Sequence, residues 1–142
     1  RVHFEISVTN VDKPMLSAEP LLARVKQFTE SAVWLTKAPT FAEKAQVFPS
    51  ATFIVGADTV ARLIDPTYYP NSPQMRSSFE RIKAAGCKFL AFGRCKASDF
   101  VSPDSLGIPR ILREIMVFVP ESEFRSDLSS TMLRKQGNGE TA

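Results

Sequence analysis

Hydroxyl and cationic side chains gather in the stretch "SDLSSTMLRK" near the end of the chain. Ser129, Ser130 and Thr131 are consecutive, and Arg134 and a second cation follow about one helical turn later. At the start of a helix, free N–H groups and the positive end of the helix dipole favour an anion, and a guanidinium can fork onto a phosphate. The stretch therefore predicts a phosphate cradle. The alternative is that Ser129 only caps a surface helix whose cations lie near its C-terminal end.

A second stretch, "FIVGADTVARL", joins a predicted strand to a predicted helix. Gly56 allows a ligand or a backbone to approach closely at this turn. Asp58 has two interpretations: its carboxylate caps the helix as the N-cap residue, or it accepts hydrogen bonds from the hydroxyls of a ribose. The turn by itself leaves both open.

The composition restricts the class of protein. A chain of 142 residues, 44% hydrophobic and 23% charged, is typical of one soluble globular domain. The net charge of +3 is small and the basic residues are scattered, so we expect a small anionic ligand at most and no nucleic acid partner. No apolar stretch is long enough to span a bilayer and no signal peptide is recognisable, so we expect no membrane partner and a cytoplasmic location. Cys87 and Cys95, with one histidine in the chain, lack zinc-site spacing, and we predict no metal ligands.

Segments typical of strands alternate with segments typical of helices. The predicted strands are 2–9, 31–36, 51–58, 87–94 and 115–120, and the predicted helices are 17–30, 39–48, 58–64, 74–86 and 129–137. We expect Ser17 to cap the first helix and Gly86 to close the fourth. This alternation predicts an α/β fold with a mostly parallel sheet, helices on both faces, and ligands at the carboxyl ends of the strands. We expect a single domain over 1–136 and a flexible tail over 137–142.

Four stretches stand in an order that resembles the nucleotidylyltransferase superfamily: "FEISVTNVDKP", "VWLTKAPTFAEKAQVFP", "FIVGADTVARLIDPTYY" and "FRSDLSSTMLRK". The resemblance is to the adenylyltransferases that act on nicotinamide or nicotinate mononucleotide, and in particular to their cytidylyltransferase-like branch. It covers nearly the whole chain, and its specific part is the closing Ser-Ser-Thr-x-x-Arg motif. It implies a Rossmann-like nucleotidylyltransferase fold.

The resemblance also implies how ATP is held. Gly56 and Asp58 would contact the adenosine ribose, and Arg94, at the end of "FLAFGR", would lie near the phosphates. The residues of the closing motif would hold the triphosphate: Ser129, Ser130, Thr131 and Arg134. Mg²⁺ would arrive with ATP, bridging its phosphates.

The mononucleotide acceptor has its own implied contacts. Lys13 would lie near the mononucleotide, and Trp34, Thr36 and Thr40 would contact the pyridine ring and its neighbouring groups. For Trp34 the alternative is a core aromatic on a short strand. For Thr40 the alternative is a residue that starts a helix after Pro39.

One motif of the family has no counterpart in this sequence. The family carries His-x-Gly-His after its first strand, whereas the one histidine here, His3, is followed by Phe4 and Glu5 and is interpreted as a strand-edge residue. We interpret the chain as lacking the family's first strand and helix, so that it is inactive or weak alone. The gap would leave an apolar sheet edge that invites a second copy, and we predict a homo-oligomer.

Three functions therefore remain at this stage. The first is transfer of AMP from ATP to a mononucleotide, with release of pyrophosphate. The second is a nucleotide-binding pseudoenzyme or regulatory domain without catalysis. The third is a plain α/β scaffold whose serine-rich end is a phosphorylation target.

Overall fold

The computed structural model describes residues 2–12, 14–96 and 99–125. Contacts divide the described chain into two compact units. The first unit comprises the described residues up to Ala51 together with Ser72–Cys87, and the second comprises Thr52–Asn71 and the described residues from Lys88 on. Each unit is built around its own parallel strands. No helix within the described ranges is long and apolar enough to cross a bilayer.

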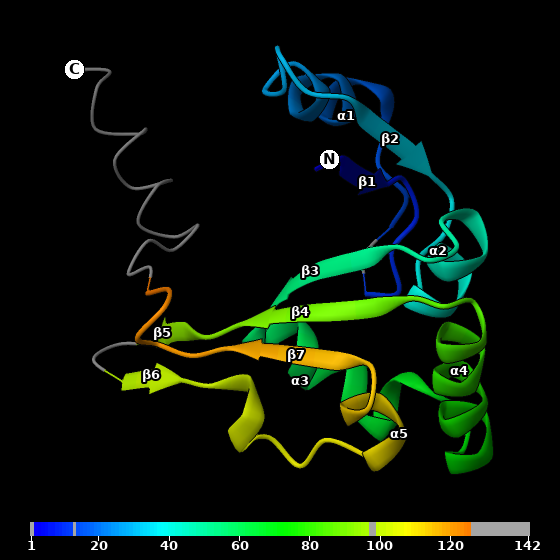
Figure 1. Ribbon diagram of the computed structural model, residues 1–142. Helices are drawn as coiled ribbons and strands as arrows, with labels where there is room; N and C mark the ends of the chain where they lie inside the picture. Colours follow the sequence, from blue (N-terminus) through cyan, green and yellow to red (C-terminus); the bar gives the residue numbers. More distant parts are fainter. Residues whose placement is uncertain (1, 13, 97–98, 126–142) are drawn as a thin grey trace. The chain divides into compact units, whose positions relative to one another are not determined.

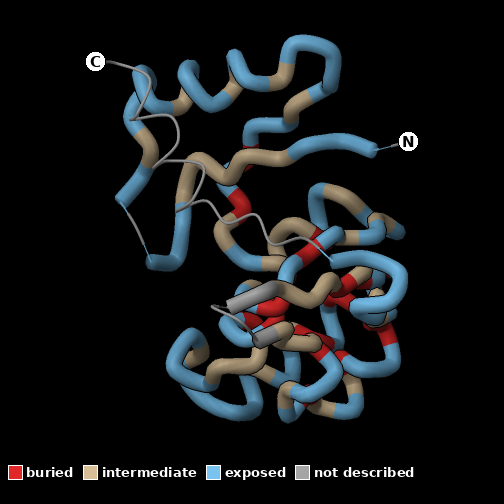
Figure 2. Tube along the Cα trace, turned by 90° about the vertical axis from the view of Figure 1, so that its left-hand side faces the viewer, coloured by how far each residue is buried: buried red, intermediate tan, exposed pale blue. Residues whose placement is uncertain are grey.

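The first unit begins with a parallel pair of strands. Strand β1 (Phe4–Ser7) pairs with β2 (Val33–Thr36), and helix α1 (Ala18–Val25) lies between them in the chain (Figure 1). No described residue in the range 2–35 is buried, as the pale and tan tube of this region shows (Figure 2). The rings of Phe4 and Phe28, 4.6 Å apart between centroids, attach the end of the α1 segment to β1.

Two helices provide most of the buried hydrophobic residues of the first unit. Helix α2 (Phe41–Val47) packs against α4 (Ser72–Ala84), with Ala42 and Ala45 buried on α2 and Phe79 and Ile82 buried on α4. After α4 the chain turns at Gly86, whose φ of 71° is in the left-handed region that favours glycine. The predicted role of this glycine in closing the helix is confirmed.

The second unit holds a three-stranded parallel sheet in the order β3 (Thr52–Gly56), β4 (Lys88–Phe92) and β7 (Met116–Val119). Helix α3 (Ala57–Ile64) follows β3, and α5 (Arg110–Arg113) precedes β7. A short antiparallel pair, β5 (Arg94–Lys96) and β6 (Asp99–Val101), follows β4. The 3-10 turns η1 (Pro66–Tyr68) and η2 (Pro103–Ser105) complete the unit.

The two faces of the three-stranded sheet differ. One face is buried, through Val55, Phe89, Ala91 and Met116, and α3 packs against β3 and β4 behind the sheet in Figure 1. The other face, here called the open face, consists of Ile54, Leu90, Phe92, Val117 and Val119. Ile54 and Val117 remain 60% and 58% exposed. The described residues place helix α3 on one face of this sheet, and the prediction of helices on both faces stays a prediction for the open face.

The mixed α/β class and the parallel pairing are confirmed, while several boundaries are wrong. Helix α1 ends at Val25, well before the predicted end, and its N-cap Ser17 makes no side-chain cap hydrogen bond. The predicted strand 87–94 is broken at Gly93, because the chain changes direction there to form the β5–β6 pair. That pair and α5 were not predicted, since three- and four-residue elements show too few periods of hydrophobic patterning.

Candidate functional site

The turn after β3 places Asp58 at the carboxyl end of the three-stranded sheet. Helix α3 begins at Ala57 with Gly56 as its N-cap, so the interpretation of Asp58 as the N-cap is wrong. A glycine has no side chain with which to cap a helix, and no side-chain cap is made here. Asp58 lies in the first turn instead, where the helix dipole favours its negative charge.

The Arg94 side chain reaches Asp58 from the start of β5, the segment that follows β4. β3 and β4 run parallel with Gly56 beside Phe92, so the chain segments that follow them leave the sheet at one edge. β4 ends at Phe92, Gly93 follows it, and Arg94 begins β5. The Arg94 guanidinium donates a hydrogen bond to Asp58 Oδ2 and forms an ion pair with it. The structure thus brings together two predicted site residues that are 36 positions apart.

Exposure decides what this pair can do. The Asp58 and Arg94 side chains are 59% and 40% exposed, so water competes with their mutual attraction. An exposed ion pair of this kind contributes little to stability and exchanges partners easily. Its carboxylate can accept hydrogen bonds from sugar hydroxyls, and its guanidinium can bind a phosphate by two parallel hydrogen bonds.

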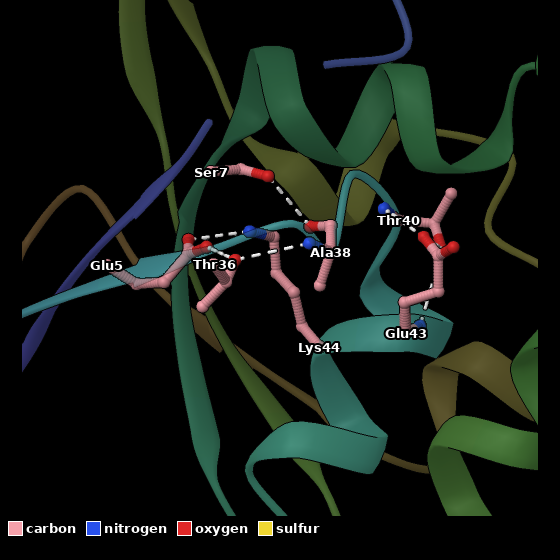
Figure 3. A network of polar contacts seen from close by, with 7 residues as sticks. All are labelled: Glu5, Ser7, Thr36, Ala38, Thr40, Glu43 and Lys44. Carbon is pink, nitrogen blue, oxygen red and sulfur yellow. Dashed lines mark hydrogen bonds and ion pairs between the residues drawn. The ribbon is translucent and has the colours of Figure 1, made fainter. Parts of the chain in front are cut away.

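The carboxyl end of the β1–β2 pair holds a different polar cluster, shown in Figure 3. Glu5 accepts a hydrogen bond from the Thr36 hydroxyl through Oε1, and an ion pair from Lys44 Nζ at 2.6 Å through Oε2. The Lys44 and Glu5 side chains are only 12% and 24% exposed. Thr36 Oγ1 also accepts from the Ala38 N–H at 3.3 Å, and Ser7 donates to the Ala38 carbonyl at 3.0 Å. This cluster ties β1, β2 and α2 to each other.

Two residues predicted to contact the mononucleotide, Thr36 and Thr40, have hydrogen-bond partners within the chain. Thr36 is buried, with its hydroxyl engaged by Glu5 and the Ala38 N–H. Thr40 caps α2 in a capping box, accepting from the Glu43 N–H at 3.3 Å while the Glu43 carboxylate accepts from the Thr40 N–H at 2.9 Å. The alternative for Thr40, a helix-start residue, is thereby confirmed.

Trp34 and Lys13 complete that set. Trp34 is exposed, so its alternative interpretation as a core aromatic is wrong; its ring meets Phe48 edge-on, with centroids 5.6 Å apart. Lys13 lies outside the described residues.

The closing motif also lies outside the described part of the chain. Ser129, Ser130, Thr131 and Arg134 belong to the range 126–142, as does the predicted tail. Their predicted role in holding a triphosphate stays a prediction.

Sequence reasoning missed Glu5 and Lys44. A signal was available for Glu5, because a carboxylate inside the short strand "FEIS" needs a partner if it is to be part-buried. No comparable signal identifies Lys44, because a lysine on a short helix is ordinarily exposed to solvent.

The titratable groups with shifted pKa values lie at the other end of α3. The pKa of Asp65 is lowered, because the Thr67 hydroxyl and the Thr67 N–H both donate to its carboxylate. The pKa of Tyr69 is raised by burial, and its hydroxyl donates to the Leu63 carbonyl at 2.9 Å. Among the residues that the structure describes, no group of three or more histidine, cysteine or acidic side chains could hold a metal ion.

Comparison with known proteins gives this chain no relatives. No family model, no curated protein and no solved structure matches it.

Proposed function

We propose that this chain is a nucleotidylyltransferase-like domain with a Rossmann-like nucleotidylyltransferase fold. The reaction of the proposed family is transfer of AMP from ATP to nicotinamide or nicotinate mononucleotide. In that reaction a phosphate oxygen of the mononucleotide attacks the α-phosphorus of ATP, a new P–O bond forms, and the α–β bridging bond breaks to release pyrophosphate. Positioning and charge stabilisation supply most of the rate in such a displacement.

The observation that carries the proposal is the meeting of Asp58 and Arg94. The sequence motifs assign a ribose contact to Asp58 and a phosphate contact to Arg94. The two side chains come from the segments that follow two adjacent parallel strands, and they meet at the carboxyl edge of the sheet, where open α/β folds bind ligands. A ribose and its phosphate chain are neighbours in a nucleotide, so one nucleotide can contact both groups.

The roles of the side chains follow from their chemistry. Asp58 accepts hydrogen bonds from the ribose hydroxyls, and Arg94 pairs with a phosphate once the nucleotide separates it from Asp58. Ser129, Ser130, Thr131 and Arg134 donate to the triphosphate. Lys13, Trp34, Thr36 and Thr40 are proposed to line the site of the mononucleotide. Mg²⁺ enters with ATP as part of the substrate and takes most of its ligands from phosphates and water.

A second candidate is nucleotide binding without catalysis. The sequence contains a single histidine, His3, which precedes β1 and does not form a His-x-Gly-His motif. Losing a preorganised donor to a developing oxyanion costs about 3–4 kcal/mol of transition-state stabilisation. A chain with the binding groups alone would act as a nucleotide sensor.

Thermal-shift titration with Mg-ATP tests binding. A ligand that binds only the native state raises stability by RT ln(1 + [L]/Kd), so a roughly millimolar site is visible at about ten millimolar ligand. We expect the midpoint to rise for the unchanged chain and to remain constant for Arg94→Gln and Arg134→Ala. Arg110→Gln is the matched control, because Arg110 is an exposed arginine in an ion pair with Glu114 and should leave the rise intact.

The same samples separate the two candidate functions. Incubation with Mg-ATP and either mononucleotide should produce pyrophosphate and a dinucleotide in equal amounts if the chain is a transferase. Binding without either product would favour the sensor. If Mg-ATP raises the midpoint equally in Arg94→Gln, the nucleotide binds elsewhere and the proposal is wrong.

A further inference from the structure

The open face presents an in-register apolar surface on the second unit. Ile54 of β3 stands beside Leu90 of β4, which stands beside Val117 of β7. In the next row towards the carboxyl edge, Phe92 stands beside Val119. A row of large aliphatic side chains across three strands, exposed at both ends, is a surface that proteins ordinarily cover.

The chain leaves the described region on this same face. After β7 it turns at Pro120, whose carbonyl accepts from the N–H groups of Glu123 and Phe124. The Phe124 ring then meets Phe92 edge-on, with centroids 5.0 Å apart. Arg125 is held to Glu121 by an ion pair one turn back. The last described residues are thus fixed beside the carboxyl end of the open face.

The sequence beyond Arg125 is suited to such a surface. In the range 126–142 the large apolar side chains are Leu128, Met132 and Leu133. If Ser129 is the N-cap of the predicted helix, Leu128 and Leu133 take the two positions of a hydrophobic staple, with Met132 beside them. Thr131 and Arg134 then lie on the side of the helix opposite Met132 and Leu133, at about 100° per residue.

We propose that the segment 128–133 docks on the open face as a helix, with Leu128, Met132 and Leu133 against Ile54, Leu90 and Val117. The dimensions agree, because three strands span about 10 Å and a helix with its side chains is about 10 Å wide. Phe124 already contacts Phe92, and Leu128 follows only four positions later. Few residues therefore need to be ordered between these two contacts.

The docked helix has a consequence for the site, which rests on the proposed function. Its first turn stands at the carboxyl end of β4, the edge from which Asp58 and Arg94 project. Because Met132 and Leu133 point to the sheet, Thr131 and Arg134 point away from it and remain free to bind a phosphate.

Methyl NMR on the full chain without nucleotide tests the docking. We expect cross-relaxation between the Met132 methyl group and the methyl groups of Ile54, Leu90 and Val117. Met132→Asp should remove the docking and shift these three residues' methyl resonances, while those of Leu22, an exposed leucine of the first unit, stay in place. Thr131→Asp adds the same charge on the side of the helix away from the sheet and should leave the contacts with Met132 intact.

Other occupants of the face give other results. If the Ile54 and Val117 resonances respond to protein concentration and not to Met132→Asp, a second copy covers the face and the proposal is overturned. Cross-relaxation from these methyl groups to residues of the first unit, unchanged in Met132→Asp, overturns it equally. The measurement needs no ligand, so docking can be found even if Mg-ATP does not bind, and failure of one proposal is distinguishable from failure of the other.

Discussion

The β1–β2 pair and the three-stranded sheet each have an ion pair near the carboxyl ends of their strands, and the two ion pairs differ in how far they are exposed to water. At the carboxyl end of β1–β2, Glu5 is enclosed by Thr36 and Lys44, and every member of the cluster is at least partly buried. At the carboxyl end of β3–β4, Asp58 and Arg94 form an ion pair with each other, and both side chains are open to water.

This difference in exposure separates ion pairs that stabilise the fold from ion pairs whose partners a ligand can replace. A buried ion pair whose remaining atoms are hydrogen-bonded is expensive to break, because the group left behind stays in a medium of low dielectric constant. An exposed pair is rehydrated at little cost when a ligand displaces one partner. We therefore expect mutations at the first end to change stability and mutations at the second end to change binding.

Lys44→Met gives the largest expected effect. It leaves the Glu5 carboxylate part-buried with one of its two side-chain partners, and we expect a loss of about 2–3 kcal/mol in the free energy of unfolding, below the range for fully buried pairs. Urea denaturation measures it. Lys37→Met, at an exposed lysine of the same unit, is the control, and adding Glu5→Gln to Lys44→Met should restore part of the loss. A Lys44→Met variant as stable as the unchanged chain would remove the distinction between the two ends.

Gly93→Ala tests whether the turn between β4 and β5, which positions Arg94, requires a residue without a side chain. A Cβ at this position would overlap the ring of Phe100 on β6, so the ring or the strand must move. Forced packing of this kind costs about 2 kcal/mol. Gly107→Ala, where a Cβ would meet nothing within 4 Å, is the matched control for thermal denaturation. Equal midpoints for the two variants would contradict the close approach of Phe100.

Tyr69 provides a pH-dependent test in the second unit. Burial raises its pKa in the folded state above the usual value near 10, so it favours folding fully below that value and this contribution is lost as the pH rises through the folded pKa. Tyr69→Phe should cost about 1 kcal/mol near neutral pH by removing the hydrogen bond to the Leu63 carbonyl. Urea denaturation should show the unchanged chain losing stability above pH 10 more steeply than Tyr69→Phe. The exposed Tyr68, as Tyr68→Phe, should retain the steeper loss.

Asp58→Asn gives the smallest expected change in stability, within about 0.5 kcal/mol, because its ion pair is largely hydrated. Its effect on ligands should be larger and should depend on their chemistry. Binding of Mg-ATP should weaken, since an amide accepts fewer hydrogen bonds from a ribose than a carboxylate does. Binding of tripolyphosphate, which has no ribose, should strengthen because Arg94 is released. Titration calorimetry with both ligands decides this, and equal weakening of both would contradict the assigned roles.

The sequence predicted the strands and helices better than it predicted the side-chain contacts between them. Continuous apolar runs such as "FIV" and "FLAF" identify parallel strands by themselves, and β3 and β4 were found for that reason, although only one face of these strands is buried. The placement of Asp58 and Arg94 at the carboxyl ends of predicted strands followed from the sequence, but their ion pair did not, because side-chain pairing depends on how β5 leaves Gly93. The Glu5–Lys44 pair depends on where α2 packs, which no local pattern determines.

The turn at Gly86 has a consequence for the order of folding events. Next to it, the Ser50 N–H donates to the Ala85 carbonyl at 2.8 Å, and Cys87 Sγ lies 3.3 Å from the Phe48 carbonyl oxygen, a contact across 39 positions of the chain. Closing a loop of that length has an entropic cost that the local hydrogen bonds of α4 do not have. The same closure brings Thr52 and Lys88, the first residues of β3 and β4, into register. We expect α4 to form early and the junction and the β3–β4 pairing to form together, so substitutions at Phe48 or Gly86 should slow folding more than substitutions on the exposed side of α4.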